Sequence, residues 1–148
     1  MRKIKHISVI GSGIMGSRIA CHFANIGVKV LLLDICPSEL LETEKEKGLT
    51  LKDKVVKNRL VKTSFFNTLK TKPGSLYVEE NKENIQLGNL EDDINKIEES
   101  DWVIEVVVEK IEIKKKIFDL IEKNRNKGTL ITSNTSGIPV KEMVKGRE

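Results

Sequence analysis

Several features that define large protein classes are scarce in this sequence. Its 148 residues include two cysteines, two histidines and one tryptophan, and aromatic residues make up 4% of the chain. Cys21 and Cys36 form no C-x-x-C pair, and Cys21 is expected as a small core residue rather than a reactive thiol. No apolar run approaches the ~20 residues of a membrane-spanning helix, and Met1 leads into the first strand without a secretory signal. These absences predict a protein of the reducing cytoplasm, without a metal site.

Charge is distributed unevenly along the chain, whose net charge is +4. Residues 48–72 contain seven Lys or Arg and one acidic residue, whereas residues 73–112 contain three lysines and twelve acidic residues. Such runs are typical of solvated helical surfaces, although the basic segment also suits an anionic ligand. Aromatic residues in the basic segment are limited to Phe65 and Phe66, and the acidic segment would repel a phosphate backbone. Nucleic acid is therefore not an expected partner.

The most informative stretch is residues 11–16 (GSGIMG), which follows a strand-like run and precedes an apolar helix. In this context Gly11 permits a tight turn, Gly13 lets the backbone approach a pyrophosphate, and Gly16 lets the helix lie close to the sheet. The N-terminus of the helix then presents free N–H groups to the phosphates. The motif predicts a dinucleotide site. The residues expected to hold the cofactor here are Gly11, Gly13, Ile14, Met15 and Gly16.

Asp34 follows the second predicted strand, roughly twenty residues after the glycine turn. An acid at this place accepts hydrogen bonds from the adenosine ribose hydroxyls. Its carboxylate would also repel the extra phosphate of NADP. The sequence therefore predicts NAD as the cofactor, and the combination of strand, helix and acid disfavours a chance glycine turn.

Strand and helix patterns alternate along a chain long enough for one domain, which predicts an α/β fold with a Rossmann-type doubly wound parallel sheet. Ligands of such sheets bind at the carboxyl ends of the strands. A charged helical arm with a break near Gly48 is expected after the second strand, and Ile113, Ile117, Leu120 and Ile121 are expected to form the buried face of a later helix. The expected strands are residues 5–10, 28–33, 85–87, 101–108 and 129–132, and the expected helices are residues 14–25, 37–62, 92–99 and 109–126.

Three motifs together carry a family resemblance: residues 11–20 (GSGIMGSRIA), residues 101–109 (DWVIEVVVE) and residues 133–136 (SNTS). They resemble the L-3-hydroxyacyl-CoA dehydrogenases of fatty-acid β-oxidation over essentially the whole chain. Many dehydrogenases share the glycine motif, whereas the SNTS motif is much more specific. The phrase from residue 112 to residue 139 looks especially like large prokaryotic proteins that fuse the dehydrogenase to an enoyl-CoA hydratase.

The resemblance implies roles for four residues near the sheet. Glu109 and Lys114 match positions that contact NAD in the family, and the alternative for Lys114 is a solvated helix lysine. Ser136 matches the serine that hydrogen-bonds the substrate's 3-oxygen, where a hydroxyl can donate to a ketone and accept from an alcohol. Asn134 matches a position near the nicotinamide ribose, and its alternative role is to hold the turn.

In the family the helical arm contacts the acyl-CoA substrate. By their spacing from Gly48, Lys52 and Arg59 fall where contacts with CoA are made. Phosphate recognition suits the guanidinium of Arg59. The alternative for Lys52 is a solvated side chain on the arm.

The family's general base is a histidine, held by a glutamate, on the strand that follows the serine motif. The chain ends at Glu148, and its histidines, His6 and His22, match no such position. Residues 1–148 are therefore expected to be the NAD-binding domain of a longer chain, without the helical C-terminal domain that mediates homo-oligomerisation. The parent reaction oxidises (S)-3-hydroxyacyl-CoA to 3-oxoacyl-CoA with NAD, and the isolated chain is expected to bind NADH without turnover.

Two other functions are compatible with the same glycine motif. The chain is alternatively a free-standing NAD-sensing or NAD-binding module without catalysis. A hydroxyacid dehydrogenase of the 3-hydroxyisobutyrate type is disfavoured by residues 133–136, because those enzymes carry different residues after the corresponding strand.

Overall fold

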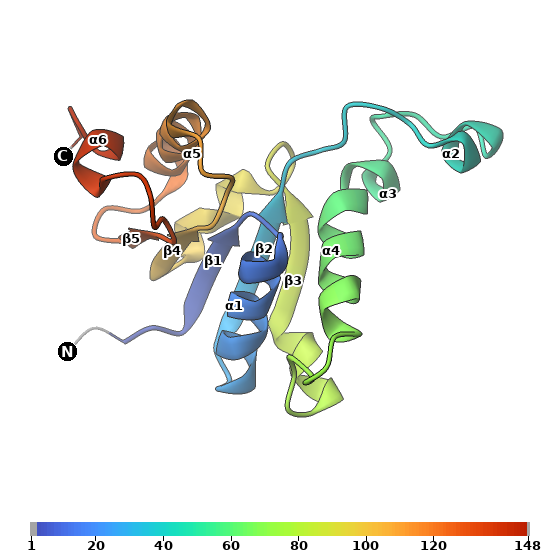
Figure 1. The fold of residues 1–148 in the computed structure, drawn as a ribbon, viewed down its shortest axis with the longest axis horizontal. Coiled ribbons are helices and arrows are strands. Elements are labelled where there is room, and N and C mark those ends of the chain that lie inside the picture. Colours follow the sequence, from blue (N-terminus) through green and yellow to red (C-terminus); the bar gives the residue numbers. More distant parts are fainter. Residues whose placement is uncertain (1–2, 148) are drawn as a thin grey trace.

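A computed structural model describes residues 3–147, which form one five-stranded sheet with helices on both faces (Figure 1). All the strand pairs are parallel, and the strand order is β3-β2-β1-β4-β5. The chain builds outward from the central β1 in one direction and then in the other. This is the doubly wound order of the Rossmann type, so the predicted fold class is confirmed. The strands are β1 (His6–Ile10), β2 (Lys29–Asp34), β3 (Ile85–Asn89), β4 (Trp102–Glu105) and β5 (Leu130–Ser133).

Helices cover the two faces of the sheet and create two apolar cores. Side chains alternate between the faces along each strand, so Val30 and Leu32 of β2 join one core while Leu31 and Leu33 join the other. The first core is closed by α1 and α4, and the second by α5, η2 and α6. The α-helices are α1 (Ile14–Asn25), α2 (Glu42–Glu46), α3 (Lys54–Lys57), α4 (Arg59–Leu69), α5 (Ile111–Asn124) and α6 (Val140–Met143), and the 3-10 helices are η1 (Glu79–Asn84) and η2 (Ile94–Glu99).

Cys21 illustrates the packing of α1 against the sheet. Its side chain is fully buried in the first core. Burial raises the pKa of the Cys21 thiol to about 11, because the charged thiolate loses its hydration. The prediction that Cys21 is a small core residue is confirmed.

The arm between β2 and β3 is less regular than the expected helix over residues 37–62. The break near Gly48 is confirmed, since Gly48 has a φ of +68° and follows the end of α2. A second break follows, where a carboxylate oxygen of Asp53 accepts hydrogen bonds from the N–H and hydroxyl of Thr50 at 2.7 and 2.8 Å. The arm then continues to the end of α4, beyond the expected limit, because Val61 and Phe65 pack into the first core.

The strand expected over residues 101–108 ends early, at Glu105. The carboxylate of Glu105 accepts a hydrogen bond from the N–H of Val107 at 2.7 Å, which turns the chain away from the sheet. Helix α5 begins only at Ile111. The apolar composition of the segment indicated a longer strand, but Val106 and Val107 are only half-buried and Val108 is 59% exposed.

Candidate functional site

The glycine turn after β1 is shaped by close backbone approaches at two of its three glycines. Gly11 has a φ of +103°, and a Cβ at this residue would lie 2.5 Å from the carbonyl oxygen of Val106. A Cβ on Gly16 would lie 1.7 Å from the carbonyl oxygen of Gly11, which is closer than any real contact. Both positions therefore require glycine for the fold itself.

Gly13 is different, because it faces open space. Among residues 3–147, no heavy atom outside its neighbours lies within 4 Å of an ideal Cβ at this position. Gly13 is the N-cap of α1, and no described side chain caps the helix there. The first N–H groups of α1 therefore lack intrahelical partners, and Gly13, Ile14 and Met15 are exposed. Such an open, donor-rich helix start fits the pyrophosphate of a dinucleotide.

The carboxylate of Asp34 is hydrogen-bonded directly to the glycine turn. Its Oδ2 accepts hydrogen bonds from the N–H of Ser12 at 2.9 Å and from the Ser12 hydroxyl, while Oδ1 accepts one from the N–H of Ile35. Ser12 itself is fully buried. Asp34 is partly exposed at the end of β2, so its carboxylate retains acceptor capacity for ribose hydroxyls. The sequence analysis did not identify this role of Ser12. The signal available in the sequence was a hydroxyl residue between the first two glycines of the motif.

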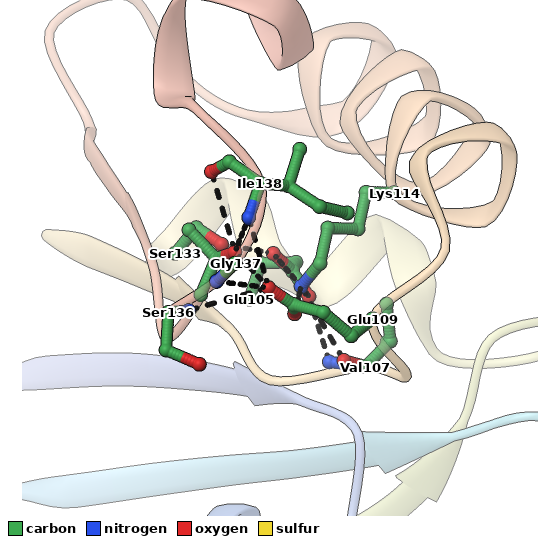
Figure 2. A network of polar contacts seen from close by, with 9 residues as sticks. Glu105, Val107, Glu109, Lys114, Ser133, Ser136, Gly137 and Ile138 are labelled. Atoms are coloured by element: carbon green, nitrogen blue, oxygen red, sulfur yellow. Dashed lines mark hydrogen bonds and ion pairs between the residues drawn. The ribbon is translucent and has the colours of Figure 1, made fainter.

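A second polar group lies where β4 and β5 end, and its centre is fully buried (Figure 2). The ammonium group of Lys114, on α5, donates to both carboxylate oxygens of Glu105 at 2.9 and 3.0 Å. The hydroxyl of Ser133 donates to the same carboxylate. Both Lys114 and Glu105 have side-chain exposures of 0%. This group joins the ends of two strands to the first turn of a helix.

The alternative that Lys114 is a solvated helix lysine is wrong. The expected apolar face of α5 is confirmed in part, because Ile117 and Ile121 are buried and Leu120 packs against the second core. The face that packs on the sheet consists of Lys114, Ile117, Phe118 and Ile121, whereas Ile113 is 38% exposed. The charged lysine takes an apolar position because Glu105 offers it a buried counter-ion. A lone acid in an apolar strand and a lysine at i−3 of a buried helix face were the available signals for this pair.

Glu109 extends this group to the loop after β5. Its Oε2 lies 3.2 Å from the ammonium nitrogen of Lys114, and its Oε1 accepts a hydrogen bond from the hydroxyl of Thr135. The same Oε1 accepts the N–H groups of Ser136, Gly137 and Ile138 at 3.2, 2.9 and 3.2 Å. The Thr135 hydroxyl, the Gly137 N–H and the Lys114 ammonium together lower the pKa of Glu109 from 4.5 to about 2.

The low pKa of Glu109 predicts a pH-dependent stability. Because the pKa is lower in the folded chain than in the unfolded chain, the carboxylate stabilises the fold above pH 4.5, and this contribution is lost as the pH falls towards 2. Urea unfolding of the wild type and of Glu109→Gln measures it. The wild type is expected to be the more stable at pH 7, with a difference that shrinks between pH 4.5 and pH 2. A difference that is constant over this range would contradict the assignment.

The residues expected to face the substrate lie on the loop that Glu109 holds. The N–H of Asn134 donates to the carbonyl oxygen of Glu105 at 2.8 Å, while the side chain of Asn134 is exposed. Ser136 is also exposed, and Figure 2 shows its hydroxyl pointing away from the two carboxylates. The carboxyl edge of the sheet thus brings Ser136 and Glu109 to the same side as the glycine turn and Asp34, as the topology predicted.

The expected CoA residues lie on the arm, which projects beside the sheet in Figure 1. Lys52 is exposed in the loop before α3. The guanidinium group of Arg59 forms an ion pair with Glu44 and donates to the carbonyl oxygen of Glu39 at 2.8 Å. Arg59 therefore braces the arm internally, a role that its sequence spacing did not indicate.

The two histidines lie away from the loop after β5 (residues 134–138), which carries Ser136 and is called the serine loop below. His6 begins β1, at the opposite end of the strand from the glycine turn, and His22 is exposed on α1. Within residues 3–147, no three His, Cys, Asp or Glu side chains are grouped to hold a metal ion. In the same part of the chain, no helix has the length and apolarity needed to cross a membrane.

Comparisons with known proteins agree with this geometry. The family described as "3-hydroxyacyl-CoA dehydrogenase, NAD binding domain" matches residues 6–148. A probable 3-hydroxyacyl-CoA dehydrogenase of Bacillus subtilis is 51% identical over 146 residues, which cover 99% of this chain and 18% of that protein. A putative fatty acid oxidation complex trifunctional enzyme of Rickettsia felis is 40% identical and is matched by 95% of this chain over 18% of its own length. This chain thus spans about a fifth of the length of these two relatives.

Solved structures show the same fold. The 3-hydroxybutyryl-CoA dehydrogenase of Escherichia coli K12 superposes with a TM-score of 0.64 at 25% identity, covering 99% of this chain and 28% of that chain. A diketoreductase superposes with a TM-score of 0.66 at 22% identity, covering 97% of this chain and 46% of that chain. The latter similarity supports the arrangement of the sheet and helices alone.

Proposed function

Because this chain belongs to the 3-hydroxyacyl-CoA dehydrogenase NAD-binding domain family, we propose that it binds NAD at the turn after β1 as part of an NAD-dependent dehydrogenase. One observation carries the proposal: Asp34 is bonded through Ser12 to a glycine turn that is open at Gly13. Ribose and pyrophosphate are adjacent in a dinucleotide, so a fixed acid next to an open helix start matches their spacing. The partly exposed carboxylate of Asp34 also disfavours the 2′-phosphate of NADP.

When bound, NAD would supply the hydride acceptor for oxidation at the carbon that bears the substrate's 3-hydroxyl. The chain's own contribution is to bind and orient. The N–H groups at the start of α1 would hold the pyrophosphate, Asp34 would accept hydrogen bonds from the ribose hydroxyls, and Ser136 would hydrogen-bond the substrate's 3-oxygen. Asn134 lies on the same loop and is assigned to the nicotinamide ribose. The side chain of Glu109 is 40% exposed, so part of its carboxylate is accessible beside the loop that carries Ser136.

For the complete protein we propose oxidation of (S)-3-hydroxyacyl-CoA to 3-oxoacyl-CoA in fatty-acid β-oxidation, in the cytoplasm. The name of the Rickettsia relative, a fatty acid oxidation complex enzyme, supports this assignment. Lys52 and Arg59 are assigned to the CoA moiety, and homo-oligomerisation to a helical domain outside these 148 residues. Because neither His6 nor His22 is placed near Ser136, we expect the 148-residue chain to bind NADH without oxidising it in the presence of acetoacetyl-CoA.

Fluorescence titrations with NADH and NADPH test the cofactor assignment. The wild type is expected to prefer NADH, and Asp34→Ala is expected to weaken NADH binding about tenfold or more, because hydrogen bonds to a charged acceptor are lost. The preference for NADH over NADPH should fall as well, since the repulsive charge is gone. Glu42→Ala, at an exposed glutamate of α2, is the matched control and should change neither value. An unchanged NADH titration for Asp34→Ala would mean that the ribose contact is misassigned.

A further inference from the structure

We propose that Glu105, Lys114 and Glu109 form a positioning relay that fixes the loop carrying Ser136 before any ligand arrives. The role of this loop in catalysis rests on the proposed function, whereas the contacts that form the relay do not depend on it. Its geometry is visible in Figure 2, where dashed lines run from the buried end of β4 through the lysine to the serine loop.

Lys114 is committed to protein acceptors. Its ammonium nitrogen lies 2.9 and 3.0 Å from the two carboxylate oxygens of Glu105, 3.2 Å from Oε2 of Glu109 and 3.4 Å from the carbonyl oxygen of Val107. An ammonium group has three protons to donate. With a side-chain exposure of 0%, Lys114 reaches a bound cofactor only by leaving these partners. Its position therefore links the two carboxylates.

Glu105 is the anchor of the relay. Its buried carboxylate accepts the N–H of Val107 at 2.7 Å, the hydroxyl of Ser133 and the ammonium of Lys114. These donors come from the turn after β4, from the end of β5 and from α5. Each donor restrains one side of the carboxylate, so the position of Lys114 is set by the sheet itself.

Glu109 transmits that position to the loop. Its Oε2 is held by Lys114, and its Oε1 receives three consecutive N–H groups, from Ser136 to Ile138, and the hydroxyl of Thr135. Three consecutive N–H groups converge on one oxygen only when the backbone has a defined curvature. The carboxylate therefore sets the backbone at Ser136, and its location depends on Lys114.

Charge accounts for why the relay uses ionised groups. A buried ion pair often stabilises a fold no more than well-packed apolar side chains of similar volume. Apolar residues, however, would offer no acceptor for the loop N–H groups. Two carboxylates around one ammonium group supply acceptors on both sides. The positive end of the helix dipole, at the start of α5, also favours the negative charge of the carboxylates. The arrangement therefore favours a preorganised loop, which is what a site that orients a reacting oxygen requires.

Amide hydrogen exchange of the 148-residue chain tests the relay without any cofactor, so its outcome is independent of NADH binding. The reporters are the amides of Ser136, Gly137 and Ile138, with the amide of Ser17 in α1 as the internal reference. Glu109→Ala sets the limit for a loop without its acceptor. The double variant Glu105→Gln/Lys114→Met leaves Glu109 in place but removes its anchor. Glu122→Gln, which alters an ion pair with Arg125 on the same helix, is the matched control.

We expect the double variant to accelerate exchange of the three loop amides about tenfold or more, towards the Glu109→Ala limit, with no change at Ser17. Ser133→Ala removes a single hydrogen bond to Glu105 and is expected to give a smaller acceleration. It keeps the test decisive should the double variant not fold. Loop exchange equal to that of the wild type in the folded anchor variants would overturn the relay, since Glu109 would then hold the loop alone. No acceleration in Glu109→Ala would overturn the hydrogen bonds to the loop as well.

Discussion

Gly16→Ala is expected to destabilise the chain by more than about 3 kcal/mol, because its new methyl group has no room. The Cβ would lie 1.7 Å from the carbonyl oxygen of Gly11, an atom of the backbone that cannot rotate away. Relief requires α1 to move off the sheet, and α1 contributes Ala20, Cys21 and Ala24 to the first core. Urea unfolding monitored by circular dichroism measures the loss, and NADH binding is expected to disappear with the turn.

Gly13→Ala is the matched comparison, with the same change three residues earlier. Because no described heavy atom outside its chain neighbours lies within 4 Å of the new Cβ, the free energy of unfolding should fall by no more than about 1 kcal/mol, the cost of alanine in place of glycine at an N-cap. NADH binding should nevertheless weaken, because the methyl group enters the space assigned to the pyrophosphate. Wild-type NADH affinity in Gly13→Ala would show that no phosphate approaches this backbone. A strong loss of stability would contradict the open space at Gly13.

Lys114→Met is expected to lower the free energy of unfolding by about 3–5 kcal/mol. Methionine fills a similar volume on the buried face of α5, so the loss arises mainly from the charge. The carboxylate of Glu105, which is also fully buried, would lose its counter-ion while remaining out of reach of water. Chemical denaturation at neutral pH gives the value directly.

The double variant Glu105→Gln/Lys114→Met separates lost charge from lost packing. Because it leaves no unpaired buried charge, it should be more stable than Lys114→Met by about 2 kcal/mol or more. Lys123→Met, at an exposed lysine of α5, is the control for the substitution itself and should lie within about 0.5 kcal/mol of the wild type. Equal stabilities of Lys114→Met and the double variant would contradict the ion pair.

The features that could be predicted from the sequence are those with a short-range signature. The glycine turn requires particular glycines at fixed spacing, and its place between β1 and α1 follows from the strand and helix patterns around it. All five strands could be located from their apolar residues, although β3 extends to Asn89, beyond the expected residues 85–87. Their parallel orientation follows from the alternation with helices. Asp34 is found because it terminates the second of these strands.

The features that could not be predicted depend on contacts between distant segments. The arm was expected as a longer helix because its charged residues favour helix, while the turn at Thr50 and the packing of Phe65 decided its true extent. Lys114 lies in a run of three lysines, and only its partner Glu105 makes burial favourable. Helical spacing from Ile117 places Lys114 on the face towards the sheet, but no local signal shows that a charged residue is buried there. The glycine turn and Asp34 could therefore be predicted from motifs. The polar group of Glu105, Lys114 and Glu109 that holds the loop after β5 could be identified only in the folded structure.

An amide chemical-shift titration of the isotope-labelled chain with NADH shows directly whether the cofactor binds at the glycine turn. The largest shift changes are expected at Gly13, Ile14 and Met15, whose amides begin α1, and at Ile35 beside Asp34. Binding with the largest changes elsewhere, for example on the arm at residues 47–57, and with a silent glycine turn would contradict binding at this turn.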